Sequence, residues 1–466
     1  MTPTSSERAP DARFRTALIV TVVALAALCA AFAALTLLQG PKLSSAQVDA
    51  RAAITAPGQA LRLFANTPVA EVAPSAVSIT PAVPFSVTTD GKIIGITFDL
   101  PLRYATDYTV SVAGVTSVSA DQPSTLSYAF TTPAPSAYYL DRGETTDEIV
   151  RTGLSGAARD VVYSAPGIQA FAVVTETVTA VVTTTDTNGS ALSIVDGETG
   201  LVESVALPGE GTITGFTMSD VGHVLGFVFT DARAADPVTG DEPGILDRAL
   251  MKLDLDAGRD LATVDDYDGN PLAVYDWRFV PGGSSVVVLT GDRSAYLATA
   301  DDLEPIGQLA GLGHVARTGE SMTVRTARGS AVLDFATGEL TFFDPSPVDG
   351  EKASVGESEV LTGGDRVQRV AVFDEATGRY VSSVVRDDGE TSRTLYATPG
   401  SLGSITSFSV SPNEQYVAIE SVDDYANVVS DDYPAAPRAS TVQTVVVDAE
   451  TGAVVRIVEG FGWLWN

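Results

Sequence analysis

The residues best suited to chemistry in this chain form three copies of an Asp-Asp-Tyr triplet. In each copy the paired carboxylates can attract a cation, and the tyrosine offers a rigid apolar ring with a polar tip, a frequent anchor at interfaces. The pattern favours a ligand or partner face, although solvated acidic loops in an acidic protein remain the alternative. The candidate binding residues are Asp265, Asp266, Tyr267, Asp423, Asp424, Tyr425, Asp431, Asp432 and Tyr433.

Sequence patterns for catalysis and for bound cofactors do not occur in this chain. Its two histidines, His223 and His314, have no cysteine partner, and neither His-x-x-x-His nor His-Glu-x-x-His is found. The nucleophile elbow Gly-x-Ser-x-Gly and the glycine loops that bind phosphates or dinucleotides are missing as well. Acidic residues are plentiful, but abundance alone does not identify a glycosidase pair. We therefore predict no catalytic, cofactor or metal residues.

Two loops resemble calcium loops in their density of oxygen ligands. One places Asp266, Asp268 and Asn270 around Gly269, and the other is Asp-Thr-Asn-Gly at 186–189. Neither completes the EF-hand pattern, and neither has a glutamate at the twelfth position. We interpret both as ordinary turns.

One uncharged segment predicts where the protein works. Residues 16–38 form 23 consecutive uncharged and mostly apolar positions, a helix of roughly 34 Å at about 1.5 Å per residue, which suffices for a membrane core of about 30 Å. Arg13 and Arg15 precede it, so the head 1–15 is expected in the cytoplasm and the rest outside. An uncleaved signal anchor fits better than cleavage near 46–50, because the polar flank lacks a clean Ala-x-Ala. The flank of Cys29 does not match a lipobox.

Composition restricts the partners of the exported part. Cys29 is the sole cysteine, so no disulfide can form outside the membrane. The formal net charge is −31, and this surface repels nucleic acid and anionic lipid headgroups. Solubility alone is one explanation of the charge, and a basic partner or a cation is the other. We expect an envelope protein or a wall polymer as partner, contact with the membrane through 16–38, and no nucleic acid.

The first part of the exported chain divides into a tether and a small β domain. Residues 39–70 are Ala-rich and polar and are predicted as a tether. Within 71–133, alternating strand-like runs are separated by Pro, Gly or Asp, and 89–92 (Thr-Asp-Gly-Lys) is a hairpin signal. The runs Ile94-Gly-Ile-Thr-Phe98 and Thr106-Asp-Tyr-Thr-Val110 resemble bacterial Ig-like domains of the S-layer-associated type. That resemblance implies an Ig-like β-sandwich acting as a spacer or stalk.

After Pro133-Ala-Pro135 a repeat emerges. The phrase Asp-x-x-(Thr/Ala)-Gly lies between apolar strands and is typical of hairpin turns, in which Asp caps the backbone and Gly takes a positive φ. Its spacing corresponds to one or two units of about 40 residues, as in four-stranded propeller blades. The five copies are Asp196–Gly200, Asp254–Gly258, Asp334–Gly338, Asp374–Gly378 and Asp448–Gly452.

A second phrase, strand–turn–strand, occurs at 213–229, 274–290 and 405–420. These segments resemble the inner strand pairs of TolB-type and Trp-Asp-repeat-like propeller blades, and the Asp-x-x-(Thr/Ala)-Gly hairpins resemble the outer pairs. We predict an all-β protein with one N-terminal transmembrane helix, and a propeller of about seven blades over 136–466. The strand-like end 461–466 is expected to pair beside the first propeller segment and close the ring. Two stacked sandwiches are the rival architecture.

Propeller geometry predicts where the triplets lie. With strands a to d numbered outward from the axis, the b–c and d–a connections share one face, here called the long-loop face. The long segments 231–248, 264–270 and 422–440 fall at such positions and contain all three triplets. We expect a non-catalytic binding or scaffolding protein that presents this face outside the membrane. An enzyme active on cell-wall polymers and a purely structural envelope component are the alternatives.

Overall fold

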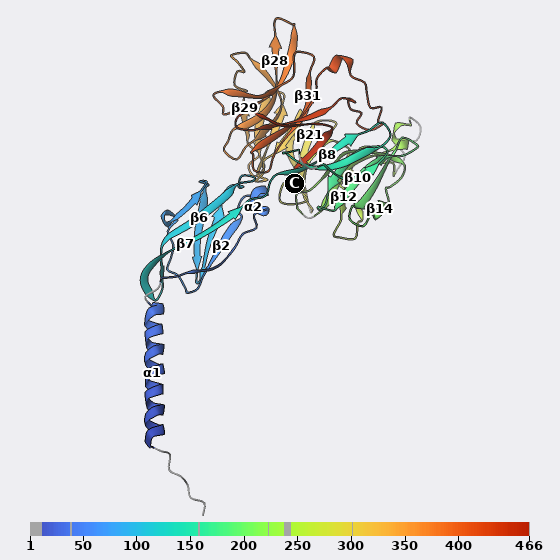
Figure 1. Cartoon of the computed structure of the whole chain (residues 1–466). Coiled ribbons are helices and arrows are strands. Elements are labelled where there is room, and N and C mark those ends of the chain that lie inside the picture. The colour runs from blue at the N-terminus through green and yellow to red at the C-terminus, as the bar shows by residue number, and fades with distance from the viewer. Residues whose placement is uncertain are drawn as a thin grey trace, which may run out of the picture. The chain divides into compact units, whose positions relative to one another are not determined.

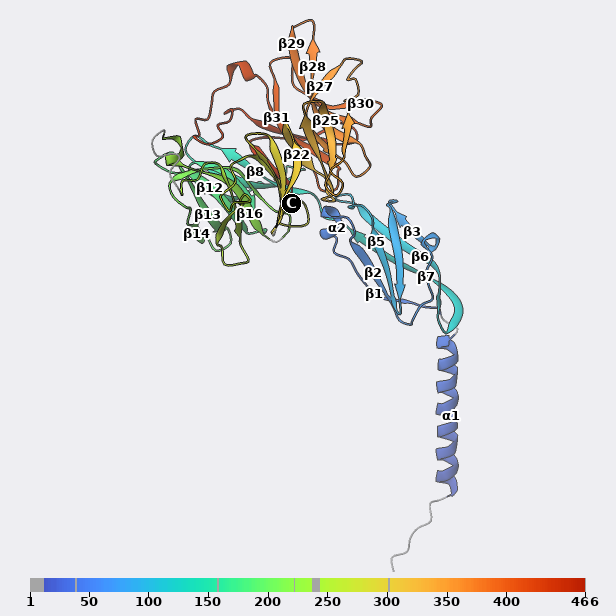
Figure 2. The same cartoon turned by 180° about the vertical axis from the view of Figure 1, so that it is seen from behind.

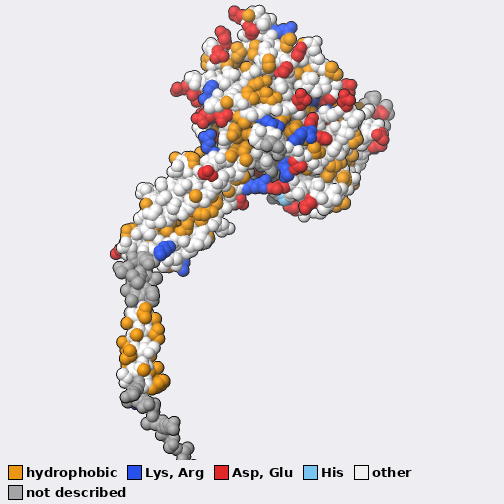
Figure 3. Space-filling model, in the orientation of Figure 1, with side chains coloured by type: hydrophobic (Ala, Val, Ile, Leu, Met, Phe, Trp, Pro, Cys, Tyr) orange, Lys and Arg blue, Asp and Glu red, His pale blue; other side chains and the backbone are white. Residues whose placement is uncertain are grey.

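The computed structural model describes residues 12–37, 40–156, 159–221, 223–236, 244–300 and 302–465. Two compact units make up the chain, unit 1 (Met1–Pro133) and unit 2 (Ala134–Asn466) (Figures 1 and 2). Residues 1–133 carry eight acidic and eight basic side chains, so the whole net charge of −31 belongs to unit 2. Figure 3 accordingly shows many carboxylates on the visible face of unit 2 and few on that of unit 1.

Helix α1 (Ala12–Leu37) covers nearly all of the uncharged stretch. Its described side chains are those of residues 14–29. Among the described residues, no helix is long and apolar enough to span a membrane. The predicted head 1–15 and the predicted anchor 16–38 lie partly outside the described residues.

Unit 1 consists of two antiparallel sheets whose apolar faces meet, with the ring centroids of Phe98 and Phe130 6.2 Å apart. Burial alternates along the strands, so that Leu61 and Leu63 are fully buried between exposed or half-buried neighbours. The predicted turn at 89–92 is present, with Gly91 at φ 56°. The sheets are β1 (Leu43–Gln47), β2 (Ala60–Ala65), β5 (Ile93–Phe98) and β4 (Phe85–Asp90), and β3 (Val77–Thr80), β6 (Asp107–Ser117) and β7 (Ala120–Thr131), with short helices α2 (Ala52–Thr55) and η1 (Pro74–Ala76).

The predicted tether 39–70 is wrong, because most of it is folded into unit 1. β2 lies in the middle of the four-stranded sheet, between β1 and β5. The side chains of α2 are buried at Ala53 and Ile54. Alanine-rich composition concealed the period-two pattern of β2, in which Leu61, Leu63 and Ala65 are buried and the residues between them are exposed or half-buried.

The described residues of unit 2 form seven four-stranded antiparallel sheets, the blades of a β-propeller. The first strands of successive blades contact each other, as β11 and β15, β19 and β23, and β23 and β27 do, which identifies them as the inner strands. From the inner strand outward the blades are: blade 1, β35 (Phe461–Trp465), β8 (Ser136–Arg142), β9 (Asp147–Gly153), β10 (Arg159–Ala165); blade 2, β11 (Ile168–Val173), β12 (Val178–Thr184), β13 (Ser190–Asp196), β14 (Val202–Val205); blade 3, β15 (Gly211–Met218), β16 (Val224–Asp231), β17 (Ala249–Asp254), β18 (Leu261–Thr263); blade 4, β19 (Val274–Phe279), β20 (Val286–Thr290), β21 (Ser294–Ala298), β22 (Leu303–Gln308); blade 5, β23 (Gly311–Val315), β24 (Ser321–Thr326), β25 (Gly329–Asp334), β26 (Leu340–Phe343); blade 6, β27 (Ala353–Val360), β28 (Arg366–Asp374), β29 (Arg379–Asp387), β30 (Ser392–Ala397); blade 7, β31 (Ser404–Val410), β32 (Tyr416–Val422), β33 (Gln443–Asp448), β34 (Val454–Glu459).

The C-terminal strand closes the ring, as the sequence predicts. β35 pairs antiparallel with β8, from Phe461 opposite Leu140 to Trp465 opposite Ala137. The last strand of the chain thereby becomes the inner strand of blade 1. Closure gives β8 a partner on its inner side and completes the four-stranded sheet of blade 1.

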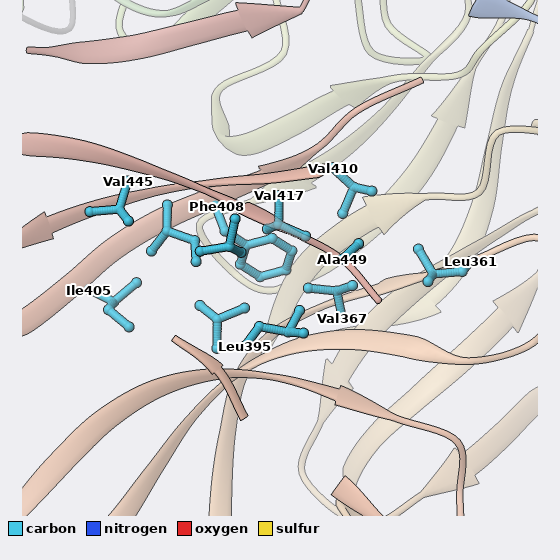
Figure 4. Close-up of a cluster of buried hydrophobic side chains, with 12 residues drawn as sticks. Leu361, Val367, Leu395, Ile405, Phe408, Val410, Val417, Val445 and Ala449 are labelled. Atoms are coloured by element: carbon cyan, nitrogen blue, oxygen red, sulfur yellow. The ribbon is translucent and has the colours of Figure 1, made fainter. Parts of the chain in front are cut away.

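The apolar cores lie between neighbouring sheets. Figure 4 shows the core between blades 6 and 7, where Leu395 of β30 faces Ile405 and Phe408 of β31. Apolar residues cover both faces of most blades because each blade is packed between two others. This explains the continuous apolar runs of b strands such as β16, in which almost every residue is buried.

Four of the five Asp-x-x-(Thr/Ala)-Gly turns join strands c and d, the outer pair, as predicted. In these turns the Asp carboxylate accepts backbone N–H groups two and three residues ahead, as Asp448 does from Glu450 and Thr451. The fifth prediction is wrong, because Asp374–Gly378 joins β28 and β29, which are strands b and c of blade 6. The local turn geometry is the same at either position, so the phrase alone does not determine which pair it joins.

Candidate binding site on the long-loop face

A pocket of about 530 Å³ opens on the long-loop face where the last blade meets the first. Its volume lies within the usual range for small-ligand sites. Four carboxylates line it against a single arginine, so the pocket is acidic. The lining residues are Asp141, Arg142, Asp423, Asp424, Asn427, Ala439, Ser440, Thr441, Val442, Gln443, Glu459, Gly460 and Phe461.

Ring closure assembles this pocket from segments far apart in sequence. Asp141 and Arg142 end β8, Glu459 ends β34, and Phe461 begins β35. The long b–c loop of blade 7, residues 423–442, supplies the remaining wall. Sequence reasoning identified this loop but missed the contributions of strand ends, because only closure brings them together.

The third triplet fastens the b–c loop of blade 7 to blade 1. Asp431 forms an ion pair with Arg142, whose guanidinium also stacks on the Tyr433 ring at 3.5 Å from its centroid. The Tyr433 hydroxyl donates to Asp147 Oδ2 at 2.5 Å. Asp147 is 1 % exposed and also accepts from the backbone N–H of Ile168 at 2.8 Å. Asp431 and Tyr433 therefore hold the fold, and the cation of the pocket is neutralised internally.

Burial of Tyr433 and its hydrogen bond to Asp147 raise the pKa of this tyrosine to about 12. The phenol therefore stays a hydrogen-bond donor throughout the physiological pH range.

A second group of contacts also holds the b–c loop of blade 7, in addition to those of Asp431 and Tyr433. Arg438 Nη1 donates to Glu420 Oε2 at 2.9 Å, and Glu420 Oε1 accepts from the Gly462 N–H at 2.6 Å. Both groups of contacts join the loop of blade 7 to blade 1, the first through Arg142 of β8 and the second through Glu420 to Gly462 of β35.

The second triplet lies at the pocket and has freer side chains. Asp423 accepts from Gln443 Nε2 at 2.7 Å, and Asp424 caps the short helix η3 (Tyr425–Asn427) through the Ala426 N–H at 3.1 Å. Tyr425 is 61 % exposed. Tyr267 of the first copy is 67 % exposed, so the second copy is distinguished by the place of its two carboxylates in the pocket wall.

The first triplet lies in the connection between blades 3 and 4 and contributes nothing to the pocket lining. The Asp266 carboxylate accepts the N–H groups of Asp268 and Asn270, both at 2.9 Å. These bonds, that to Asn270 first, lower the pKa of Asp266. The Tyr267 hydroxyl donates to the Leu303 carbonyl at 2.5 Å.

The calcium-like loops have the geometry of ordinary turns. Asp266 uses its carboxylate on its own turn, and Asn188 has a φ of 61°, as Asn-Gly turns allow. Among the residues that the structure describes, no group of three or more His, Cys, Asp or Glu side chains could hold a metal ion.

His314 joins the inner strands of three blades. Its Nε2 lies 2.8 Å from Glu357 Oε1 and its Nδ1 lies 3.5 Å from Glu359 Oε2, and its ring stacks on Phe408 with the centroids 5.4 Å apart. Burial alone would lower the pKa of His314, but the hydrogen bond to Glu357 and the charge of Glu359 outweigh it and raise that pKa. Burial also disfavours the charge of Glu357, yet the bond to His314 lowers the pKa of this carboxyl.

We expect His314→Gln to reduce the free energy of unfolding by about 1.5–3 kcal/mol at pH 6, the usual contribution of a hydrogen bond to a charged group, and by less at pH 9. A pKa raised by folding stabilises the protein fully below the ordinary value of about 6.5, and this contribution is lost as the pH rises through the folded pKa. Denaturant unfolding at both pH values measures the difference. The control is His223→Gln, since His223 is exposed and its Nδ1 makes only long contacts, of 3.4 and 3.3 Å, with the two carboxylate oxygens of Asp256. An equal loss for His314→Gln at both pH values would contradict the assignment.

No protein-family model matches this chain, and no curated protein matches it. Solved structures similar to it include the β-propeller domain of the trilobed protease from Pyrococcus furiosus (12 % identity, TM-score 0.43, 73 % of this chain and 90 % of that one). TolB from Acinetobacter baumannii (12 %, 0.35, 84 % and 82 %) and a periplasmic gluconolactonase from Pseudomonas aeruginosa (14 %, 0.40, 71 % and 98 %) are also similar. These structures include TolB as well as proteins named as enzymes, so the similarity does not indicate an activity for this chain. The propeller assignment rests on the strand pairing of unit 2.

Proposed function

We propose that this protein is a membrane-anchored, extracytoplasmic binding or scaffolding protein without catalytic activity. Its long-loop face takes up an envelope partner or ligand that carries cationic groups. The observation that supports this is the acidic pocket, where Asp141, Asp423, Asp424 and Glu459 face the cavity and Arg142 is neutralised by Asp431. Electrostatic complementarity of this kind favours partner selection and fast association.

The anchor part of the proposal rests on residues 16–38 and on the arginines before them. Unit 1 would act as a spacer, as its resemblance to bacterial Ig-like domains implies. Two separate experiments test this part: carbonate washing of isolated membranes, and protease treatment of intact cells. Retention in the membrane with digestion from outside is expected, and release into the wash would contradict it.

We expect Asp423→Asn with Asp424→Asn to reduce partner labelling about tenfold, corresponding to about 1.4 kcal/mol of lost charge contacts. Asparagine retains the capping and hydrogen-bonding geometry of both sites. The measurement is proximity labelling by the full chain in its native envelope, with wild type and variant compared. Asp265→Asn with Asp266→Asn is the matched control, because it removes the same charge from a triplet outside the pocket. An equal loss of partner labelling in both double variants would show a general charge effect and would contradict the assignment of binding to the pocket.

An enzyme acting on wall polymers is the alternative, and the pair Glu357 and Glu359 beside His314 is what favours it. A glycosidase needs one carboxylic acid with a raised pKa, whereas the pKa of Glu357 is lowered. Glu357 would therefore serve as the ionised carboxylate of such a pair and not as its acid. Release of soluble fragments from purified cell wall, abolished by Glu357→Gln, would establish the alternative.

A further inference from the structure

Blade 6 carries a hairpin that rises above its neighbours on the long-loop face. β28 and β29 have nine residues each, against five to eight in the b and c strands of the other blades. At about 3.3 Å per residue, the last two residue pairs of this hairpin extend it by roughly 7 Å beyond the end of β27. The last two pairs, Phe373 with Tyr380 and Asp374 with Arg379, have no third strand beside them, since the pairing with β27 ends at Val372. Figures 1 and 2 both show this tip projecting from unit 2.

An aromatic pair occupies the projecting tip. The rings of Phe373 and Tyr380 meet edge to face, with centroids 5.3 Å apart. Phe373 nevertheless stays 47 % exposed and Tyr380 60 % exposed. A cross-strand aromatic pair stabilises a hairpin, but stabilisation alone does not require two large rings on a ribbon that extends into solvent.

Apolar exposure continues from this hairpin toward blade 7. The Thr398 N–H donates to the Ser382 carbonyl, two residues from Tyr380, and so places the connection 398–403 beside β29. The Tyr425 N–H in turn donates to the Leu402 carbonyl at 2.8 Å. We call the exposed apolar residues along this path the aromatic ridge. It consists of Phe373, Tyr380, Leu402, Tyr425 and Val429, which are 38–67 % exposed.

We propose that the aromatic ridge is a docking surface for a partner protein whose contact segment carries lysine or arginine beside apolar side chains. Carboxylates border the ridge and outnumber the cations Arg379 and Arg438, of which Arg438 is already paired with Glu420. This excess of negative charge favours a basic partner by charge complementarity. A second copy of this chain would be repelled, because docking would bring two acidic borders together. Anionic lipid would be repelled for the same reason. The bordering carboxylates are Asp374, Glu375, Asp423, Asp424 and Asp432. The proposal goes beyond the pocket, since the tip of blade 6 is not part of the pocket lining.

Photo-crosslinking from Tyr380→p-benzoylphenylalanine in the full chain, in cells, tests the ridge. We expect a crosslink to one protein, mapped by mass spectrometry to a segment with Lys or Arg flanked by apolar residues. That protein, once purified, must bind the full chain in detergent and lose affinity as salt is raised. A crosslink only to a second copy, only to lipid, to a segment without basic residues, or to nothing would overturn the proposal.

The same binary complex tests the two rings directly. Phe373→Thr with Tyr380→Thr keeps the β-propensity of the hairpin and is expected to weaken binding at least tenfold, as for aromatic anchors at interfaces. Tyr275→Thr is the matched control, because Tyr275 is 66 % exposed on another blade, and it should bind like wild type. If the double variant unfolds, Tyr380→Thr alone takes its place. Unchanged binding by the Phe373→Thr and Tyr380→Thr double variant would overturn the proposal that the ridge is a docking surface. If only Asp423→Asn with Asp424→Asn lost binding, the pocket would be the sole binding site.

Discussion

Trp463→Ala should destabilise unit 2 by about 3–5 kcal/mol, the range measured for truncation of a buried tryptophan. Trp463 is 5 % exposed, its ring stacks on Tyr139 with centroids 6.1 Å apart, and it meets Trp465 edge to face at 5.5 Å. These contacts hold the last strand of the chain against the first blade. Their loss therefore weakens the one closure on which all seven blades depend.

Thermal unfolding followed by tryptophan fluorescence and circular dichroism measures this effect. Val455→Ala is the control, because Val455 lies on the outer strand of blade 7 and is 39 % exposed. A loss for Trp463→Ala no larger than that of the control would mean that the ring does not rely on its closing strand.

Arg142→Ala should cost about 3–5 kcal/mol and free the loop 423–442 from blade 1. Removing this guanidinium leaves Asp147 and Asp431 without their cation, and breaking a buried pair by removing one partner is strongly destabilising. The stacking on Tyr433 and the hydrogen bond to the Ile168 carbonyl at 2.6 Å are lost as well.

Limited proteolysis and denaturant unfolding together test this prediction. We expect faster cleavage within 423–442 in Arg142→Ala, with cleavage elsewhere unchanged at low protease concentration. Arg159→Ala is the matched control: Arg159 pairs with Asp141 and Glu148 at the surface, and such pairs are worth about 0–1 kcal/mol. Equal effects of the two variants would show that the cluster around Arg142 does not fasten the loop.

The repeat of unit 2 could be predicted because each blade shows it locally. Alternating strands, Asp-capped turns and an apolar C-terminus each follow from short-range chemistry, and they agree on a closed propeller of about seven blades. The misplaced hairpin at 374–378 and the missed β2 at 60–65 have different causes. A turn phrase identifies a hairpin but not its neighbours in the sheet, whereas the Ala-rich composition around β2 concealed a short alternating run.

The candidate site was only partly predictable. Sequence placed Asp423 and Asp424 on a long loop of the long-loop face, and both line the pocket. Asp431 and Tyr433 have the same local sequence pattern but hold the fold, because their partners Arg142 and Asp147 are almost 300 residues away in sequence. The pocket wall from Glu459 to Phe461 depends on ring closure in the same way. Contacts between residues so far apart in the sequence cannot be predicted from a local sequence pattern.

The most direct test of the central claim, that the pocket takes up an envelope partner, is thiol labelling of the full chain. Cys29 is the sole cysteine, so Cys29→Ser with Ser440→Cys places one thiol at the pocket, and Cys29→Ser with Ser204→Cys places one on the outer strand of blade 2. A hydrophilic maleimide is applied to intact cells and to purified protein. We predict that position 440 is protected in cells and reactive once purified, while position 204 reacts in both. Equal reactivity of position 440 in the two states would contradict an occupied pocket and with it the proposed binding function.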